Sequence, residues 1–145
     1  SRFFENTVAE IMEKKGEGTA REIREALSNS KMLSSDVSAA FDPNYPSVNE
    51  PNNTAYFNRG IVFNKYTGSG GKGGCNDASP EFIAGIRKIM NKNEIVWQTS
   101  ELGKVDQGGG GTIAYIMAAF GMEVIDAGIA VQNMHAPWEV VSKAD

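Results

Sequence analysis

The stretch VIDAGIAVQNMHAPWEVVSKAD, residues 124–145, decides the fold of this chain and contains His135, its single histidine. Its apolar run, residues 124–131, is short, β-branched and interrupted by Gly128, which predicts a buried strand rather than a helix. The strand carries His135 to its carboxyl end, beside Pro137, which stops regular pairing. Ligands bind at that edge of open α/β sheets, because the loops there converge on a crevice. A neutral imidazole there can bind a divalent metal if acidic partners come from elsewhere, and otherwise it only hydrogen-bonds within a loop.

Length and composition bound the class of protein. The chain has 145 residues, 41% hydrophobic and 22% charged, the balance of a globular domain rather than of a disordered or membrane protein. Its net charge of −4 gives no electrostatic support for a nucleic-acid partner. No apolar run approaches membrane-spanning length and the N-terminus lacks a signal-peptide pattern, so no membrane partner is expected. The single cysteine, Cys75, cannot form an internal disulfide, which favours a cytoplasmic setting.

The two ends of the sequence are unusual for a whole protein. The chain starts at Ser1 without an initiator methionine, and it stops at Asp145 where a further helix is about to begin. We therefore expect residues 1–145 to be a single, partial domain of a longer chain.

Periodicity and capping signals predict an α/β fold. Helical spacing covers residues 1–15, Thr19 with Glu22 is a capping box for a second helix, and Ser79 followed by proline starts a third. Strands are expected at residues 31–37, 60–66, 95–99 and 124–131, and a fourth helix at 112–120. The alternation in the second half predicts a mixed β-sheet flanked by helices.

Two glycine-rich segments invite a phosphate-binding interpretation. In TGSGGKGG, residues 67–74, the lysine is followed by glycine instead of Ser or Thr and no helix starts there, so a surface hairpin is expected. Residues 108–111 precede the expected fourth helix, and their backbone N–H groups can approach an anion. The alternative function is therefore a non-catalytic anion- or nucleotide-binding module.

Three segments resemble one enzyme family. Residues 34–46, SSDVSAAFDPNYP, resemble the serine-x-Asp and proline-Asn-Tyr segments of the aspartyl aminopeptidase and vacuolar aminopeptidase I family. Residues 134–139, MHAPWE, resemble its methionine-histidine segment, and residues 106–113 its Gly/Thr-rich turn. Order and approximate spacing agree, so the resemblance covers nearly the whole chain.

The resemblance implies a metallopeptidase with two zinc ions that removes the N-terminal residue from peptides. Asp36 and His135 fall on family metal-ligand positions; the alternative for Asp36 is a turn-capping aspartate. Two such metals would polarise the scissile carbonyl and activate a bridging water. Glu139 is expected to support the imidazole of His135, because metal-bound imidazoles usually donate their other N–H to an acceptor. Asp106 and Asp126 are expected to cap a helix and to bond at a strand end.

The chain also departs from the family pattern. The family's other metal ligands, its catalytic glutamate and the glutamate beside it lie upstream of the position of Ser1. The resemblance therefore implies the C-terminal part of a catalytic domain, with half a metal site and no catalytic residue. It also implies a large homo-oligomer, for which the aromatic-rich loop 41–56 is the candidate contact surface.

The strand expected at residues 60–66 contains the residues that bear on substrate preference. Family members that prefer acidic N-terminal residues have a lysine there that binds the substrate carboxylate. The aligned position holds Asn64, and Lys65 is displaced by one residue, which turns its side chain to the opposite face unless a bulge restores it. We expect Asn64 and Lys65 at the substrate site, and a preference for neutral or apolar N-terminal residues.

Overall fold

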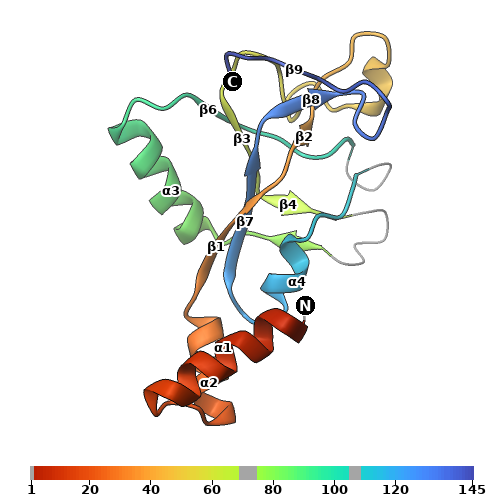
Figure 1. Cartoon of the computed structure of the whole chain (residues 1–145). Coiled ribbons are helices and arrows are strands. Elements are labelled where there is room, and N and C mark those ends of the chain that lie inside the picture. Colours follow the sequence, from red (N-terminus) through yellow and green to blue (C-terminus); the bar gives the residue numbers. More distant parts are fainter. Residues whose placement is uncertain (1, 69–74, 105–108) are drawn as a thin grey trace.

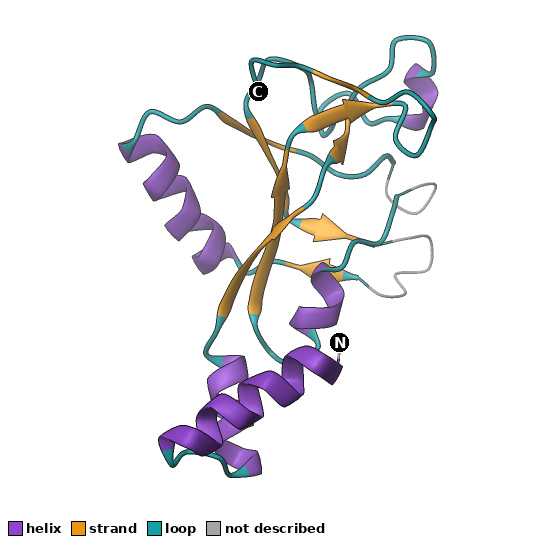
Figure 2. Cartoon of the chain, in the orientation of Figure 1, coloured by secondary structure: helices purple, strands orange, loops and turns teal. Residues whose placement is uncertain are grey.

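The computed structural model describes residues 2–68, 75–104 and 109–145 and has a four-stranded mixed sheet at its centre (Figures 1 and 2). The strand order is β1 (Lys31–Ser35), β7 (Glu123–Gly128), β3 (Ile61–Asn64) and β6 (Trp97–Thr99). β1 is parallel to β7, β7 is antiparallel to β3, and β3 is parallel to β6. The predicted α/β fold with a mixed sheet flanked by helices is confirmed.

Smaller sheets extend this one. β2 (Ser38–Ala39), β8 (Ala130–Gln132) and β9 (Val140–Val141) form a three-stranded sheet in the order β2-β8-β9. β4 (Tyr66–Thr67) and β5 (Asn76–Asp77) pair antiparallel, and residues 69–74 of the segment expected as a surface hairpin lie outside the described residues.

The long strand expected at residues 124–131 is two strands, β7 and β8. The break comes where β7 ends at Gly128, against the carbonyl of Asp36. The strand expected at 31–37 ends at Ser35 for the same reason. The two segments then continue side by side as β2 and β8, with Ser38 N donating to Ile129 O at 2.9 Å.

The helices begin where the capping signals indicate. α1 is Arg2–Lys15, α2 is Ala20–Ser28 and α3 is Pro80–Lys92, with a short 3₁₀ turn η1 at Pro46–Val48. The capping box before α2 is complete: Thr19 Oγ1 accepts from Glu22 N at 3.3 Å, and Glu22 Oε2 accepts from Thr19 N at 2.9 Å. Within the described residues, no helix is long and apolar enough to cross a membrane.

The fourth helix is shorter than predicted. α4 spans Ala114–Ala118 instead of residues 112–120. The Thr112 hydroxyl accepts from Ala114 N at 3.2 Å, a local bond of the kind found at turns and helix starts, which places the first residue of α4 after Thr112. Gly121, with φ of +83°, takes the left-handed conformation that ends a helix.

The two faces of the central sheet differ in chemistry. α3 covers an apolar face, where Phe63, Ile125 and Ala127 pack with Met90 (Figure 1). On the other face Ser34, Asp126 and Asn64 are register neighbours, all buried, and α4 and the β4–β5 pair lie on that side. The α1–α2 hairpin projects from the end of the sheet where β1 and β7 begin (Figure 1).

Candidate functional site

Three segments far apart in sequence enclose one pocket of about 480 Å³. They are the chain after β1, the glycine turn at residues 109–112, and the loop after β8, and Leu102 from the segment after β6 completes the wall. The pocket is lined by Asp36, Val37, Ala39, Leu102, Gly109, Gly110, Gly111, Thr112, Met134, His135 and Glu139. The structure thus brings Asp36 and His135 to the same pocket at strand ends, as predicted from the sequence, while their role as metal ligands stays a prediction.

Asp36 follows β1 directly and is positioned by the backbone of β7. Asp36 N donates to Ala127 O at 3.3 Å, and the Oδ1 atom accepts from Val37 N at 2.9 Å. A Cβ atom on Gly128 would lie 1.8 Å from the carbonyl oxygen of Asp36, so only glycine allows this approach. The side chain is half-buried, and one of its two oxygens is held by a local N–H.

His135 lies in a tight loop between β8 and β9 and is exposed. It takes a left-handed backbone conformation, with φ of +65°, as does Asn133 with φ of +58°. A bond from Ala136 N to Asn133 O, 2.9 Å long, closes the turn. Among the described residues the imidazole has no hydrogen-bond partner, so both ring nitrogens can meet a ligand.

Glu139 contacts His135 through the main chain. Its Oε1 atom accepts from His135 N at 2.6 Å, which holds the loop closed. Support of the imidazole by Glu139 stays a prediction, since the bond to His135 N uses only one of the two carboxylate oxygens.

Asn64 and Lys65 lie elsewhere. Asn64 is 2% exposed, and its Nδ2 donates to Ser100 O at 2.7 Å and to Ser38 Oγ at 3.2 Å. Lys65 lies at a bend between β3 and β4, is exposed, and forms an ion pair with Asp77. Asn64 is buried and Lys65 is exposed, the difference that the one-residue displacement predicts. Neither residue lines the pocket of Asp36 and His135. Their contact with substrate stays a prediction.

Asp126 is the charged residue that sequence reasoning undervalued. It is 1% exposed in the middle of β7, not at a strand end, and its Oδ2 accepts from the Thr112 hydroxyl. Burial raises the pKa of Asp126, an effect that the Ser34 and Thr112 hydroxyls partly offset and that the charge of Asp36 reinforces. Ser34 lies beside the carboxylate, but the pair does not meet hydrogen-bond geometry. The signal in the sequence was an acid inside an apolar run. Asp106 lies outside the described residues.

The donor set of the pocket fits zinc. Histidine nitrogen and aspartate oxygen are both ordinary zinc ligands. Across residues 2–68, 75–104 and 109–145, no group of three or more His, Cys, Asp or Glu side chains comes together. Asp36, His135 and Glu139 all line the pocket, but within the described part of the chain they do not come together as a full coordination shell.

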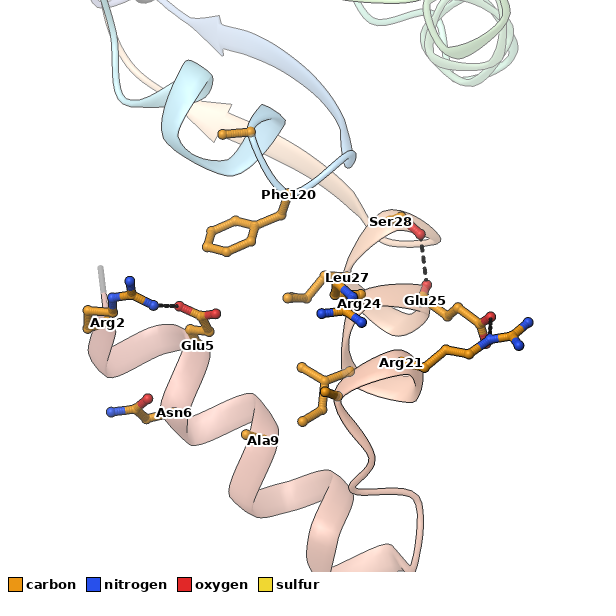
Figure 3. A pocket seen from close by; sticks show the side chains of 13 residues that line it. Arg2, Glu5, Asn6, Ala9, Arg21, Arg24, Glu25, Leu27, Ser28 and Phe120 are labelled. Atoms are coloured by element: carbon orange, nitrogen blue, oxygen red, sulfur yellow. Dashed lines mark hydrogen bonds and ion pairs between the residues drawn. The ribbon is translucent and has the colours of Figure 1, made fainter.

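A larger hollow of about 610 Å³ lies between α1, α2 and the end of α4 (Figure 3). Charged groups on its walls pair with one another: Arg2 with Glu5 at 2.8 Å and Arg21 with Glu25 at 2.7 Å. Phe120 points into it from the end of α4 (Figure 3). These paired side chains leave the hollow without the donor set that distinguishes the pocket of Asp36 and His135.

An aspartate and a histidine that line one pocket beside a mixed α/β sheet are compatible with a metal-dependent hydrolase domain. All of the chain, residues 1–145, matches the family described as aminopeptidase I zinc metalloprotease (M18). The chain belongs to this family. Membership supports the peptidase interpretation and gives no support to the alternative, a non-catalytic anion- or nucleotide-binding module.

Relatives and solved structures agree. The chain is 68% identical to a probable M18 family aminopeptidase 1 of Clostridium acetobutylicum and 42% identical to one of Thermotoga maritima, covering 100% of this chain and 31% and 32% of those proteins. The crystal structure of aminopeptidase I from C. acetobutylicum matches with a TM-score of 0.86 at 67% identity, over 100% of this chain and 31% of that one. The T. maritima structure matches with a TM-score of 0.90 at 42% identity, over 99% and 32%. The chain therefore spans about a third of the length of these relatives.

Proposed function

We propose that the intact protein is a zinc-dependent aminopeptidase that releases N-terminal residues from peptides, and that this chain is part of its catalytic domain. The observation that carries the proposal is the shared pocket of Asp36 and His135 in a chain of the zinc metalloprotease family. We further propose two zinc ions per subunit, with Asp36 and His135 as two of the ligands.

In this proposal each residue has a definite task. Zinc, when bound, would polarise the scissile carbonyl and activate water for attack. Asp36 supplies a carboxylate oxygen while its other oxygen stays bonded to Val37 N, which fixes the orientation of the group. His135 supplies a ring nitrogen from a loop that Glu139 holds closed. The general base must come from the part of the protein beyond this chain.

Paired substitutions in the intact protein test the metal assignment. Asp36 and Asp42 each accept one local backbone N–H, from Val37 at 2.9 Å and from Asn44 at 2.8 Å, but only Asp36 lines the pocket. Asp36→Asn should lower the zinc content and reduce kcat/KM on an N-terminal leucine peptide by at least about 100-fold, because a neutral amide is a poor zinc ligand. Asp42→Asn is the matched control and should leave both unchanged. Full zinc content and activity in Asp36→Asn would contradict the assignment.

Assembly into a large homo-oligomer is proposed on the resemblance and on the loop at residues 41–56. Tyr45 and Val48 on this loop are 66% and 58% exposed, and aromatic and apolar groups of this kind suit the core of an interface. Phe41 and Tyr56 stiffen the base of the loop, with ring centroids 5.4 Å apart. Light scattering of the intact protein at monomer mass would contradict the assembly.

A cytoplasmic location and the absence of nucleic-acid and membrane partners are also proposed. They rest on the net charge of −4 and on the single cysteine, Cys75, which is exposed and free. Fractionation of cells that produce the intact protein, followed by immunodetection, should recover it with the cytosol. Recovery with membranes would contradict this location.

A further inference from the structure

The polar face of the central sheet lies directly behind the glycine turn that walls the candidate site. Ser34 on β1, Asp126 on β7 and Asn64 on β3 are neighbours in register, and each is at most 2% exposed. The Nδ2 group of Asn64 is engaged by Ser100 and Ser38. Among the described residues, Asp126 is the only one of the three whose side chain bonds to a lining residue of the pocket.

The link from Asp126 to the wall is Thr112. The Thr112 hydroxyl donates to Asp126 Oδ2, and the Thr112 Oγ1 atom accepts from Ala114 N at 3.2 Å. The hydroxyl thus uses its proton and one of its lone pairs, and its rotamer is determined from two sides. Thr112 is half-buried, and Ala114, the first residue of α4, is 0% exposed.

Within the described residues the wall has few other contacts that support it. Residues 109–111 of the pocket lining are glycines, which have no side chains to anchor them. Gly109 has φ of +97° and lies against the backbone of Gly68, where a Cβ atom would be 2.6 Å from the carbonyl oxygen. Backbone packing thus supports the turn at one end, and the Thr112–Asp126 bond supports it at the other.

We propose that Asp126 is a positioning residue of the peptidase: through the Thr112 hydroxyl it sets the position of the glycine turn relative to Asp36 and His135. This inference rests on the proposed function and deepens it. A carboxylate buried in an apolar run is costly unless its hydrogen bond is made, so the Thr112 bond is strongly favoured over alternative rotamers. Asp126 does not contact substrate in this role.

The test uses Thr112→Val, which removes the hydroxyl at nearly constant shape, and Thr112→Ser, which keeps it, in the intact zinc-loaded protein. Thr112→Val should lower kcat by about 10- to 100-fold, the scale of a displacement near 1 Å, while KM changes less than about 3-fold. Thr112→Ser should retain kcat within about 3-fold of the wild type. Zinc content should stay constant in all variants. A general loss of stability would not produce this split or this rescue.

A second measurement does not depend on activity. Hydrogen exchange in zinc-free intact protein should be faster at residues 109–114 in Thr112→Val than in Thr112→Ser, because the wall loses its anchor. Asp126→Ala combined with Thr112→Val should be non-additive in kcat, since each substitution removes the Thr112–Asp126 bond. If Asp126→Ala does not fold, the two Thr112 variants still decide the matter.

Two results would overturn the inference: wild-type kcat and exchange in Thr112→Val, or equal impairment in Thr112→Ser and Thr112→Val. Failure of the proposed function looks different. In that case the wild-type intact protein neither retains zinc nor cleaves peptides, before any substitution is made.

Discussion

Gly128→Ala is the sharpest perturbation the structure offers, because β7 passes the backbone of Asp36 at Gly128. The added Cβ atom would lie 1.8 Å from the Asp36 carbonyl oxygen, 2.6 Å from its carbonyl carbon and 3.2 Å from Val37 N. All three are backbone atoms, so no side-chain rotation relieves the clash. Gly128 is not one of the described glycines that have a positive φ. The cost of adding a Cβ atom there is therefore steric and does not come from backbone strain.

The size of the displacement follows from these distances. Real Cβ contacts stay above 3.0 Å, so the separation from the Asp36 oxygen must grow from 1.8 Å by about 1.2 Å. Asp36 is bound to this strand through Ala127 O, and the carboxylate moves with its backbone. Overpacking of this kind destabilises a fold by about 1–3 kcal/mol. A shift near 1 Å at a site residue lowers activity by about 100-fold.

The assay compares Gly128→Ala with Gly85→Ala in the intact protein. Gly85 lies in α3, where an added Cβ meets no atom within 4 Å, so its replacement should raise stability by about 0.5–1 kcal/mol. We expect Gly128→Ala to lower the urea midpoint, the zinc content and kcat/KM, whereas Gly85→Ala keeps zinc and activity. Unchanged zinc content and kcat/KM in Gly128→Ala would refute the view that β7 positions Asp36.

Three further predictions concern the chain and the intact protein. The 145-residue chain alone, supplied with zinc, should not hydrolyse an N-terminal leucine peptide, since we propose that the general base lies outside it; turnover above a zinc-only blank would contradict that proposal. The intact protein should have a higher kcat/KM for peptides with N-terminal Leu than for peptides with N-terminal Asp. A preference for N-terminal Asp that disappears in Lys65→Ala would contradict this and would indicate that Lys65 lies at the substrate site. Burial raises the pKa of Glu101 above 4.5, so its stabilising contribution is present below that pH and is lost as the pH rises through the folded-state pKa. The free energy of unfolding of the wild type should therefore fall relative to that of Glu101→Gln as the pH rises above 4.5, because glutamine cannot ionise; a wild type that gains stability over the variant in this range would contradict the shift.

Local signals predicted the parts of the fold that local forces determine. The starts of α2 and α3 follow from capping side chains that bond within three residues, and both caps form as expected. Residues 95 and 96 were predicted as strand because they are apolar, yet Ile95 N bonds to Met90 O and continues the end of α3. The bond from Ile95 N to Met90 O depends on where α3 ends, and the spacing of apolar residues in the sequence does not predict that position.

The strand breaks at Gly128 and after Ser35 have a non-local cause. Each run is apolar or β-prone in sequence, and alternation alone favours one continuous strand. The break arises because two parallel strands approach within contact distance at Asp36, ninety-odd residues from Gly128 along the chain. The same approach delivers Asp36 to the pocket, so the site feature was predictable while the geometry that creates it was not.

The buried position of Asp126 could not be predicted from the sequence alone, because it depends on which strands pair with β7. Read along the chain, VIDAGIAV is an apolar strand with one acid, and an acid in a strand ordinarily faces solvent or an edge. Read across the sheet, even-numbered residues of β7 face the polar side, where Ser34 and Asn64 are the register neighbours of Asp126. Strand pairing thus converts an isolated acid into the centre of a buried polar row, and the row meets the pocket at Thr112. The chemistry of the candidate site is therefore carried by two residues that motifs reveal, Asp36 and His135. Its shape depends on a contact that appears only when β1, β7 and β3 are aligned.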